Sequence, residues 1–65
     1  MSLSLIIPLK NEEKIVLDTL KFLEKSWIKD IEHEIIFIDD FSNDETWNLI
    51  TNYKSEVINI RLIKN

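Results

Sequence analysis

The chain has 65 residues, of which 8 are basic and 12 acidic, so its formal net charge is −4. It contains no cysteine, which excludes a disulfide framework, a thiolate zinc site and a thiol nucleophile. It also contains no glycine, which excludes the glycine-rich loops that bind phosphates and dinucleotides. The basic residues of this acidic chain are dispersed, which argues against binding to nucleic acid. Because no apolar run is long enough to span a membrane and no secretory signal is present, we expect a cytoplasmic location.

Three apolar runs are expected to form β-strands. They are rich in aliphatic and β-branched residues and cover residues 3–7, 34–38 and 57–63. The first run ends at Pro8, as a strand should. The third run alternates in part with polar residues, which predicts a more exposed strand.

The two segments between these runs have the periodicity of helices. The first helix is expected to be capped by Asn11 and to bury an apolar stripe formed by Val16, Leu20, Leu23 and Trp27. The second helix is expected to be short and to begin at Ser42, in an S-x-x-E capping box. The order β-α-β-α-β, with short connections, predicts an α/β fold with three parallel strands.

The strand pattern predicts that one face of this sheet is uncovered. Crossovers that step in one direction put both helices on the same face. The first strand nevertheless has apolar residues on both faces, with Leu3, Leu5 and Ile7 on one side and Ile6 on the other. We therefore interpret residues 1–65 as the N-terminal part of a larger domain, and we expect self-association through the uncovered face.

Two loops are expected to meet at the carboxyl ends of the first two strands, where parallel α/β sheets bind ligands. Their carboxylates accept hydrogen bonds well from sugar hydroxyls and base N–H groups, which favours a nucleoside-containing ligand. The alternative roles are structural, namely an Asx-turn for the aspartates and helix-dipole matching for the glutamates. The pattern contains neither a Ser-His-Asp arrangement nor a metal-ligand cluster. The four carboxylates expected to converge are Glu12, Glu13, Asp39 and Asp40.

Two segments resemble the opening of a family 2 glycosyltransferase. Residues 4–13 read SLIIPLKNEE, and the family typically has a strand that ends in P-x-Y-N-E. Residues 34–46 read EIIFIDDFSNDET, and the family typically has E-I-I-x-V-D-D-x-S-x-D-x-T at this separation. The resemblance implies a GT-A fold, of which residues 1–65 would form the Rossmann-like, nucleotide-binding part.

The resemblance also implies roles for single residues. Asp40 matches the second Asp of the D-D pair, which contacts the base, and Glu12 matches an acidic residue that often reaches the nucleotide. Asp39 and Ser42 match positions that shape and support the loop. The nucleotide-binding residues implied in this way are Pro8, Leu9, Lys10, Glu12, Asp39 and Asp40. No catalytic and no metal-binding residue is assigned to this chain.

The sequence departs from the family pattern at two positions. Lys10 stands where the family commonly has a Tyr that stacks on the base, so the base preference is open. Phe41 replaces a small or polar residue between Asp40 and Ser42. An apolar contact with a ligand and burial in the protein are both consistent with a phenylalanine at this position.

The activity that the resemblance implies is transfer of a sugar, of the hexosyltransferase type, from a nucleotide-diphosphosugar to an acceptor hydroxyl on a saccharide, lipid or protein. Such enzymes hold Mg²⁺ or Mn²⁺ with a D-x-D motif, which residues 1–65 lack, and the isolated chain is therefore not expected to catalyse transfer. For the full-length protein, the inner face of the membrane is an alternative location.

Two other functions compete with this interpretation. A receiver-like phosphoacceptor domain also has an acidic pair at a strand end, but that pair normally follows the first strand. A small α/β module could instead bind a partner protein through the uncovered sheet face.

Overall fold

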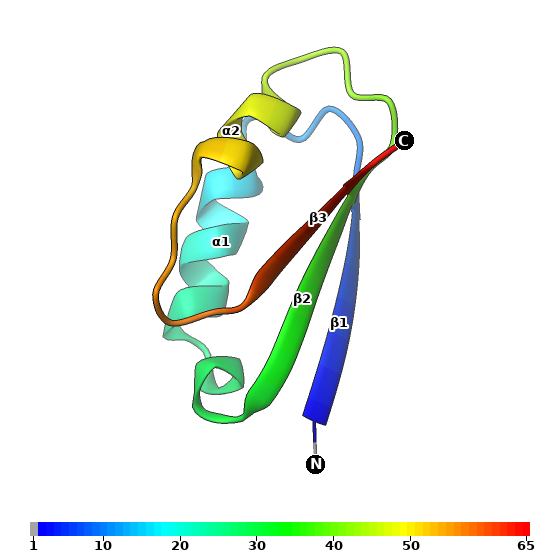
Figure 1. The fold of residues 1–65 in the computed structure, drawn as a ribbon. Helices are drawn as coiled ribbons and strands as arrows, with labels where there is room; N and C mark the ends of the chain where they lie inside the picture. The colour runs from blue at the N-terminus through cyan, green and yellow to red at the C-terminus, as the bar shows by residue number, and fades with distance from the viewer. Residues whose placement is uncertain (1) are drawn as a thin grey trace.

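The computed structural model describes residues 2–65, which form one open sheet with helices on one side (Figure 1). The three strands are parallel and lie in the order β1-β2-β3, which confirms the predicted α/β fold. No helix within the described residues is long and apolar enough to cross a membrane. The elements in chain order are β1 (Ser2–Leu9), α1 (Val16–Lys25), the 3-10 helix η1 (Trp27–Asp30), β2 (Glu32–Asp39), α2 (Thr46–Asn52) and β3 (Ile60–Lys64).

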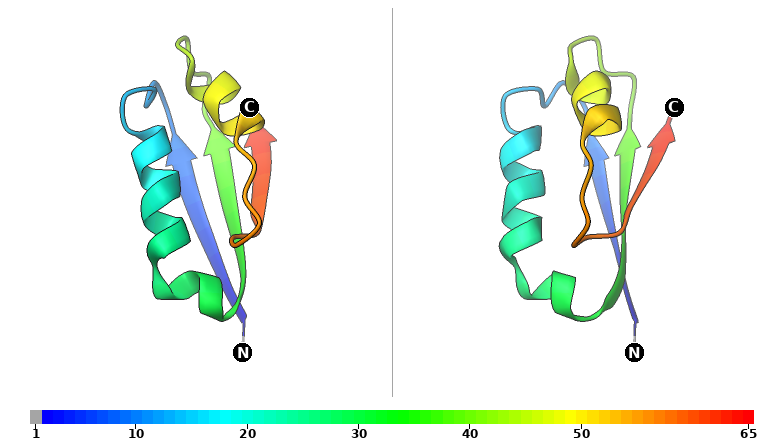
Figure 2. Two further views of the ribbon diagram at one scale, coloured as in Figure 1. Left: turned by 90° about the vertical axis from the view of Figure 1, so that its left-hand side faces the viewer. Right: turned by 60° about the vertical axis from the view of Figure 1, so that its left-hand side comes forward.

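The two faces of the sheet differ in their environment, as the strand pattern predicted. Both α-helices pack on the same face (Figure 2), where the side chains of Ile35 and Phe37 are fully buried. On the opposite face Ile6 is 59% and Ile63 is 40% exposed. No element of residues 2–65 covers this second face, which we call the open face of the sheet.

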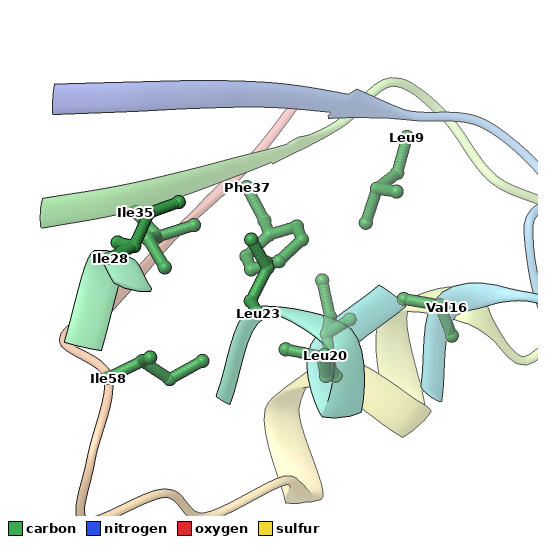
Figure 3. Packing of buried hydrophobic residues seen from close by; sticks show 9 residues of the cluster. Leu9, Val16, Leu20, Leu23, Ile28, Ile35, Phe37 and Ile58 are labelled. Carbon is green, nitrogen blue, oxygen red and sulfur yellow. The ribbon is translucent and has the colours of Figure 1, made fainter. Parts of the chain in front are cut away.

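The hydrophobic core lies between the sheet and the helices (Figure 3). Phe37 and Ile35 of β2 point toward α1, whose residues Val16, Leu20 and Leu23 are buried as predicted. Burial of each large aliphatic or aromatic side chain contributes about 1.5–3 kcal/mol. The buried hydrophobic residues are Leu9, Val16, Leu20, Leu23, Ile28, Ile35, Phe37, Ile50 and Ile58.

The predicted burial of Trp27 at the end of the α1 stripe is wrong. Helix α1 ends at Lys25, because Ser26 has an extended backbone and its hydroxyl bonds to the carbonyl oxygen of Leu23 at 2.7 Å. Trp27 then begins η1 and is 66% exposed, while Ile28 takes the place in the core.

Both predicted helix starts are also wrong. Helix α1 begins at Val16 instead of after Asn11, and α2 begins at Thr46 instead of after Ser42. Neither helix has a side-chain cap on its N-cap residue. The backbone amides of Ile15 and Val16 bond to the carbonyl oxygen of Glu12 and form a turn before α1.

The third strand begins later than predicted, at Ile60. The Ser55 hydroxyl accepts hydrogen bonds from the backbone amides of Val57 and Ile58, both at 3.3 Å. These bonds fold the segment into a turn before the strand, so Ile58 is buried from a connection and Val57 is 48% exposed.

Candidate functional site

The loops that follow β1 and β2 lie side by side at the carboxyl edge of the sheet, as predicted (Figure 1). We call residues 10–15 the first loop and residues 40–45 the second loop. The Asp40 amide donates to the carbonyl oxygen of Leu9 at 2.8 Å. The backbone amide of Asn11 donates to the Ser42 hydroxyl at 2.9 Å, and the backbone amide of Asn43 donates to Asn11 Oδ1 at 2.7 Å. The residues predicted as helix caps therefore join the two loops instead.

A second set of hydrogen bonds joins the first loop to the start of α2. The Glu12 amide donates to the hydroxyl of Thr46, a fully buried residue, at 2.8 Å. That hydroxyl and the Thr46 amide both donate to Asp44 Oδ1, at 2.5 and 2.9 Å. The Glu13 amide donates to the other oxygen of Asp44 at 3.3 Å. Asp44, and not Ser42 as the capping box predicted, therefore accepts the hydrogen bond from the backbone amide at the start of α2.

Asp44 is held in its ionised form by these bonds. Burial, the largest influence, raises the pKa of its carboxyl group, but the hydrogen bonds from the side chain and amide of Thr46 and from the Glu13 amide together outweigh it, so that the pKa is below its usual value. Sequence reasoning missed Asp44 and Thr46. The S-x-D-x-T part of the family pattern was the signal that contained them.

The two adjacent aspartates at the end of β2 have opposite environments. Asp39 is fully buried, and its Oδ1 accepts a hydrogen bond from the Ser42 hydroxyl at 2.5 Å. Its Oδ2 has no hydrogen-bond partner within the described part of the chain. Asp40 is exposed in the second loop. Asp39 thus supports the second loop through Ser42, whereas residues 2–65 leave the side chain of Asp40 exposed.

The other predicted site residues also divide into buried and exposed ones. Leu9 is only 6% exposed and belongs to the core, while its carbonyl oxygen holds the second loop. Pro8 and Lys10 are exposed, and Glu12 is half-buried. Nowhere in residues 2–65 are three His, Cys, Asp or Glu residues grouped so that they could hold a metal ion.

Both loops contain a residue with a left-handed backbone. Asn11 has φ 52° and Phe41 has φ 57°. Asparagine tolerates this conformation, whereas a bulky aromatic residue rarely adopts it. Phe41 is also 66% exposed, so residues 2–65 do not bury its side chain.

The end of β3 brings a further cation to this edge of the sheet. Lys64 Nζ lies 5.3 Å from the ring centroid of Trp47, which is half-buried against the core. The Asn65 amide donates to the carbonyl oxygen of Asp39 at 2.9 Å. No sequence pattern indicates the contact between Lys64 and Trp47, because the tertiary fold brings these residues of β3 and α2 together.

Comparison with known proteins assigns a family to the chain. Residues 4–65 match the family model described as "Glycosyl transferase family 2". A dolichyl-phosphate beta-glucosyltransferase of Dictyostelium discoideum is 43% identical over 70 residues, which cover 95% of this chain and 21% of that protein. No solved structure matches the chain significantly.

Two bacterial relatives are more distant. The poly(ribitol-phosphate) beta-N-acetylglucosaminyltransferase TarS of Staphylococcus aureus is 32% identical over 88% of this chain and 10% of its own length. A poly(ribitol-phosphate) beta-glucosyltransferase of Bacillus spizizenii is 30% identical over 98% of this chain and 10% of its own length. The chain therefore spans about a fifth or a tenth of the relatives it matches.

The family match covers all of the elements and both loops described above except the first two residues of β1. It decides against the receiver-like alternative, whose acidic pair follows a different strand. The match agrees with the two sequence segments that carried the resemblance, and the observed topology agrees with a partial Rossmann-like domain. The chain belongs to glycosyltransferase family 2.

Proposed function

We propose that this chain forms the nucleoside-binding part of an enzyme that transfers a sugar from a nucleotide-diphosphosugar to an acceptor hydroxyl. The observation that carries the proposal is the pair of hydrogen-bonded loops at the carboxyl edge of the sheet. The side chain of Asp40, in the second loop, is exposed to solvent there. This edge is where open parallel sheets bind ligands. Membership of the family supplies the reaction class.

The exposed residues of the site have complementary roles in this proposal. Asp40 accepts a hydrogen bond from an N–H group of the base. Lys10 offers a cation to the base or to the diphosphate, and Glu12, which is half-buried, accepts from a hydroxyl of the ribose. Pro8, which is exposed near the end of β1, lines the site. Leu9 and Asp39 contribute indirectly, because their hydrogen bonds to Asp40 and Ser42 fix the second loop.

The metal expected for such an enzyme does not fit the residues of this chain, because no three potential ligands are grouped within residues 2–65. We propose that Mg²⁺ or Mn²⁺ is held by other parts of the whole protein, and that residues 1–65 alone do not catalyse transfer. The names of the relatives mention two different compounds, dolichyl phosphate and poly(ribitol phosphate). An assay of the whole protein with each of these two compounds as acceptor tests which of them it uses, and its cytoplasmic location stays a prediction.

The test is an NMR titration of the isotope-labelled chain with UDP, GDP and ADP. We expect amide shifts confined to residues 8–12 and 39–42, larger for one base than for the other two. The variant Asp40→Asn should weaken this binding, because an amide is a poorer hydrogen-bond acceptor for the base than a carboxylate. The matched control is Asp30→Asn, an exposed aspartate in η1 at the other end of β2.

Two results would contradict the proposal. The first is a well-dispersed spectrum that none of the three nucleotides changes, which would favour the partner-binding alternative. The second is an equal loss of affinity in Asp40→Asn and Asp30→Asn, which would place the binding outside the second loop. Binding that responds to Asp40 alone would support the site.

A further inference from the structure

Phe41 stands opposite Lys10 where the two loops meet. Asp40, on one side of Phe41, bonds to Leu9, and Ser42, on its other side, bonds to Asn11. Lys10 lies between Leu9 and Asn11, so the two flanking hydrogen bonds, at 2.8 and 2.9 Å, bring Lys10 and Phe41 to matching positions in the two loops. Both side chains are exposed at this edge of the sheet.

Neither the position nor the backbone of Phe41 is explained by the stability of the fold. Its side chain is 66% exposed, so it contributes little hydrophobic stabilisation. Its φ of 57° is costly for an aromatic residue, and such strain persists where the surrounding contacts impose it. Here the amide of Asp40 and the hydroxyl of Ser42 fix the loop on both sides. An aromatic ring is thus held in water at the edge where the ligand is proposed to bind.

The other strongly exposed aromatic side chains lack this combination. Phe22 on α1 is 71% exposed and Trp27 in η1 is 66% exposed. Neither has a positive φ, and neither element belongs to the carboxyl edge of the sheet. The placement of Phe41 is therefore not a general property of exposed rings in this protein.

We propose that the ring of Phe41 is the stacking surface for the base of the donor nucleotide. The inference rests on the proposed function. It adds a residue that determines affinity for the base itself: the ring contacts one face of the base, Asp40 accepts from an N–H group at its edge, and Lys10 lies across the loop. Stacking of a base on an aromatic side chain is tolerant of base identity, so Phe41 sets strength of binding more than choice of base.

The test compares Phe41→Gly and Phe41→Ala with the wild-type chain, with UDP, GDP, ADP and the base-free probe ribose 5-phosphate. Loss of the ring should weaken binding of the favoured nucleotide about five- to a hundredfold. Affinity for ribose 5-phosphate should stay within about twofold, since stacking acts on the base alone. In the wild-type complex we also expect nuclear Overhauser effects between the Phe41 ring and protons of the base.

Folding controls keep this experiment decisive. Because glycine adopts positive φ without strain, Phe41→Gly should unfold at the same temperature as the wild type or at a higher one, so its weaker binding cannot come from a damaged fold. Phe22→Ala is the matched control, since it removes an equally exposed ring from α1. It should leave all affinities unchanged.

The outcomes separate this inference from the proposed function. If the wild type binds a nucleotide and Phe41→Gly binds it equally well, the stacking role is wrong while the nucleoside site stands. If Phe41→Gly loses affinity for ribose 5-phosphate to the same extent, the effect is on the loop and the stacking role is again wrong. If the wild type binds none of the three nucleotides, the proposed function and this inference both fail.

Discussion

The neighbouring residues Asp39 and Asp40 offer a direct test of how single side chains support the site. Asp39→Ala opens a buried cavity and leaves the Ser42 hydroxyl without its acceptor, so we expect a loss of about 1–3 kcal/mol in the free energy of unfolding. Asp40→Ala changes an exposed side chain and should alter it by less than about 0.5 kcal/mol. Urea unfolding of both variants measures the difference. Equal losses would show that the Asp39–Ser42 bond does not stabilise the loop.

Thr46 offers a second test at a single hydroxyl group. Thr46→Val keeps the shape of the side chain but removes the acceptor of the Glu12 amide and the donor to Asp44. We expect unfolding to become easier by about 1–3 kcal/mol, because a partly buried amide loses its partner. Thr51→Val is the control, since that hydroxyl bonds only to the Asn48 carbonyl oxygen within α2. A similar loss in both variants would remove the special role of Thr46.

The sequence shows which loop side chains can bond to backbone amides, but not which amides they bond to. Asn11 and Ser42 have side chains that bond to nearby backbone amides, which is why both were predicted as helix caps. In the structure they bond across the two loops, to partners 31 or 32 residues away. A single sequence contains no information about which of two equally suitable amides lies closer. The same limit left the role of Phe41 open.

At the scale of elements, α1 is tied to the connection between α2 and β3 through Glu24. Its carboxylate accepts hydrogen bonds from the Ser55 hydroxyl at 2.6 Å and from the Tyr53 hydroxyl. These bonds, Ser55 first, hold the pKa of Glu24 below its ordinary value of 4.5. Because the folded pKa is depressed, this stabilisation is fully present above about pH 4.5 and is lost as the pH falls through the lower folded value.

We therefore expect the urea midpoint of the wild type to fall more steeply below pH 4.5 than that of Glu24→Gln. The glutamine variant cannot ionise, so its curve lacks this component. Glu56→Gln, which changes an exposed glutamate in the same connection, should follow the wild type. Acid profiles that coincide in the wild type and Glu24→Gln would show that the tie is already broken in solution.

The same tie predicts an alkaline limit. The hydrogen bond to Glu24, followed by burial and by the negative charge of Glu24, raises the pKa of Tyr53 above 10.0. Because the folded pKa is raised, this contribution is present below the ordinary value and is lost as the pH rises through the folded one. Tyr53→Phe should remove this alkaline dependence. A phenol that titrates in the folded chain as it does in urea, followed by its ultraviolet absorbance, would contradict the contact.

Strands were easier to predict than helix ends. The alternation along β1 assigned Ile6 correctly to one face and Leu3, Leu5 and Ile7 to the other, because side chains of a strand alternate strictly. Helix ends depend on whether a backbone carbonyl bonds to the next turn of the helix or to a nearby side chain. At Ser26 a bond to the Leu23 carbonyl oxygen ends α1 two residues before Trp27, which is exposed although the helical spacing of apolar residues continues to it.

At the scale of the whole molecule, the open face sets the chain apart from a sheet covered on both sides. Parallel sheets are normally buried on both faces. Here Ile6 and Ile63 are 59% and 40% exposed on a face that no element of residues 2–65 covers. Contiguous exposed apolar side chains mark surfaces that associate. Pairing of this face between two copies of the chain would cover these side chains.

We therefore expect the chain to self-associate reversibly, with an average mass in sedimentation experiments that rises with protein concentration. Ile6→Lys places a charge on the open face and should weaken association about tenfold or more, because the buried apolar contact is lost and the charge must be desolvated. Phe22→Lys is the matched control, since Phe22 is 71% exposed on α1, on the other side of the molecule. A monomer at all concentrations would contradict self-association, and equal effects of the two variants would assign it to a surface other than the open face.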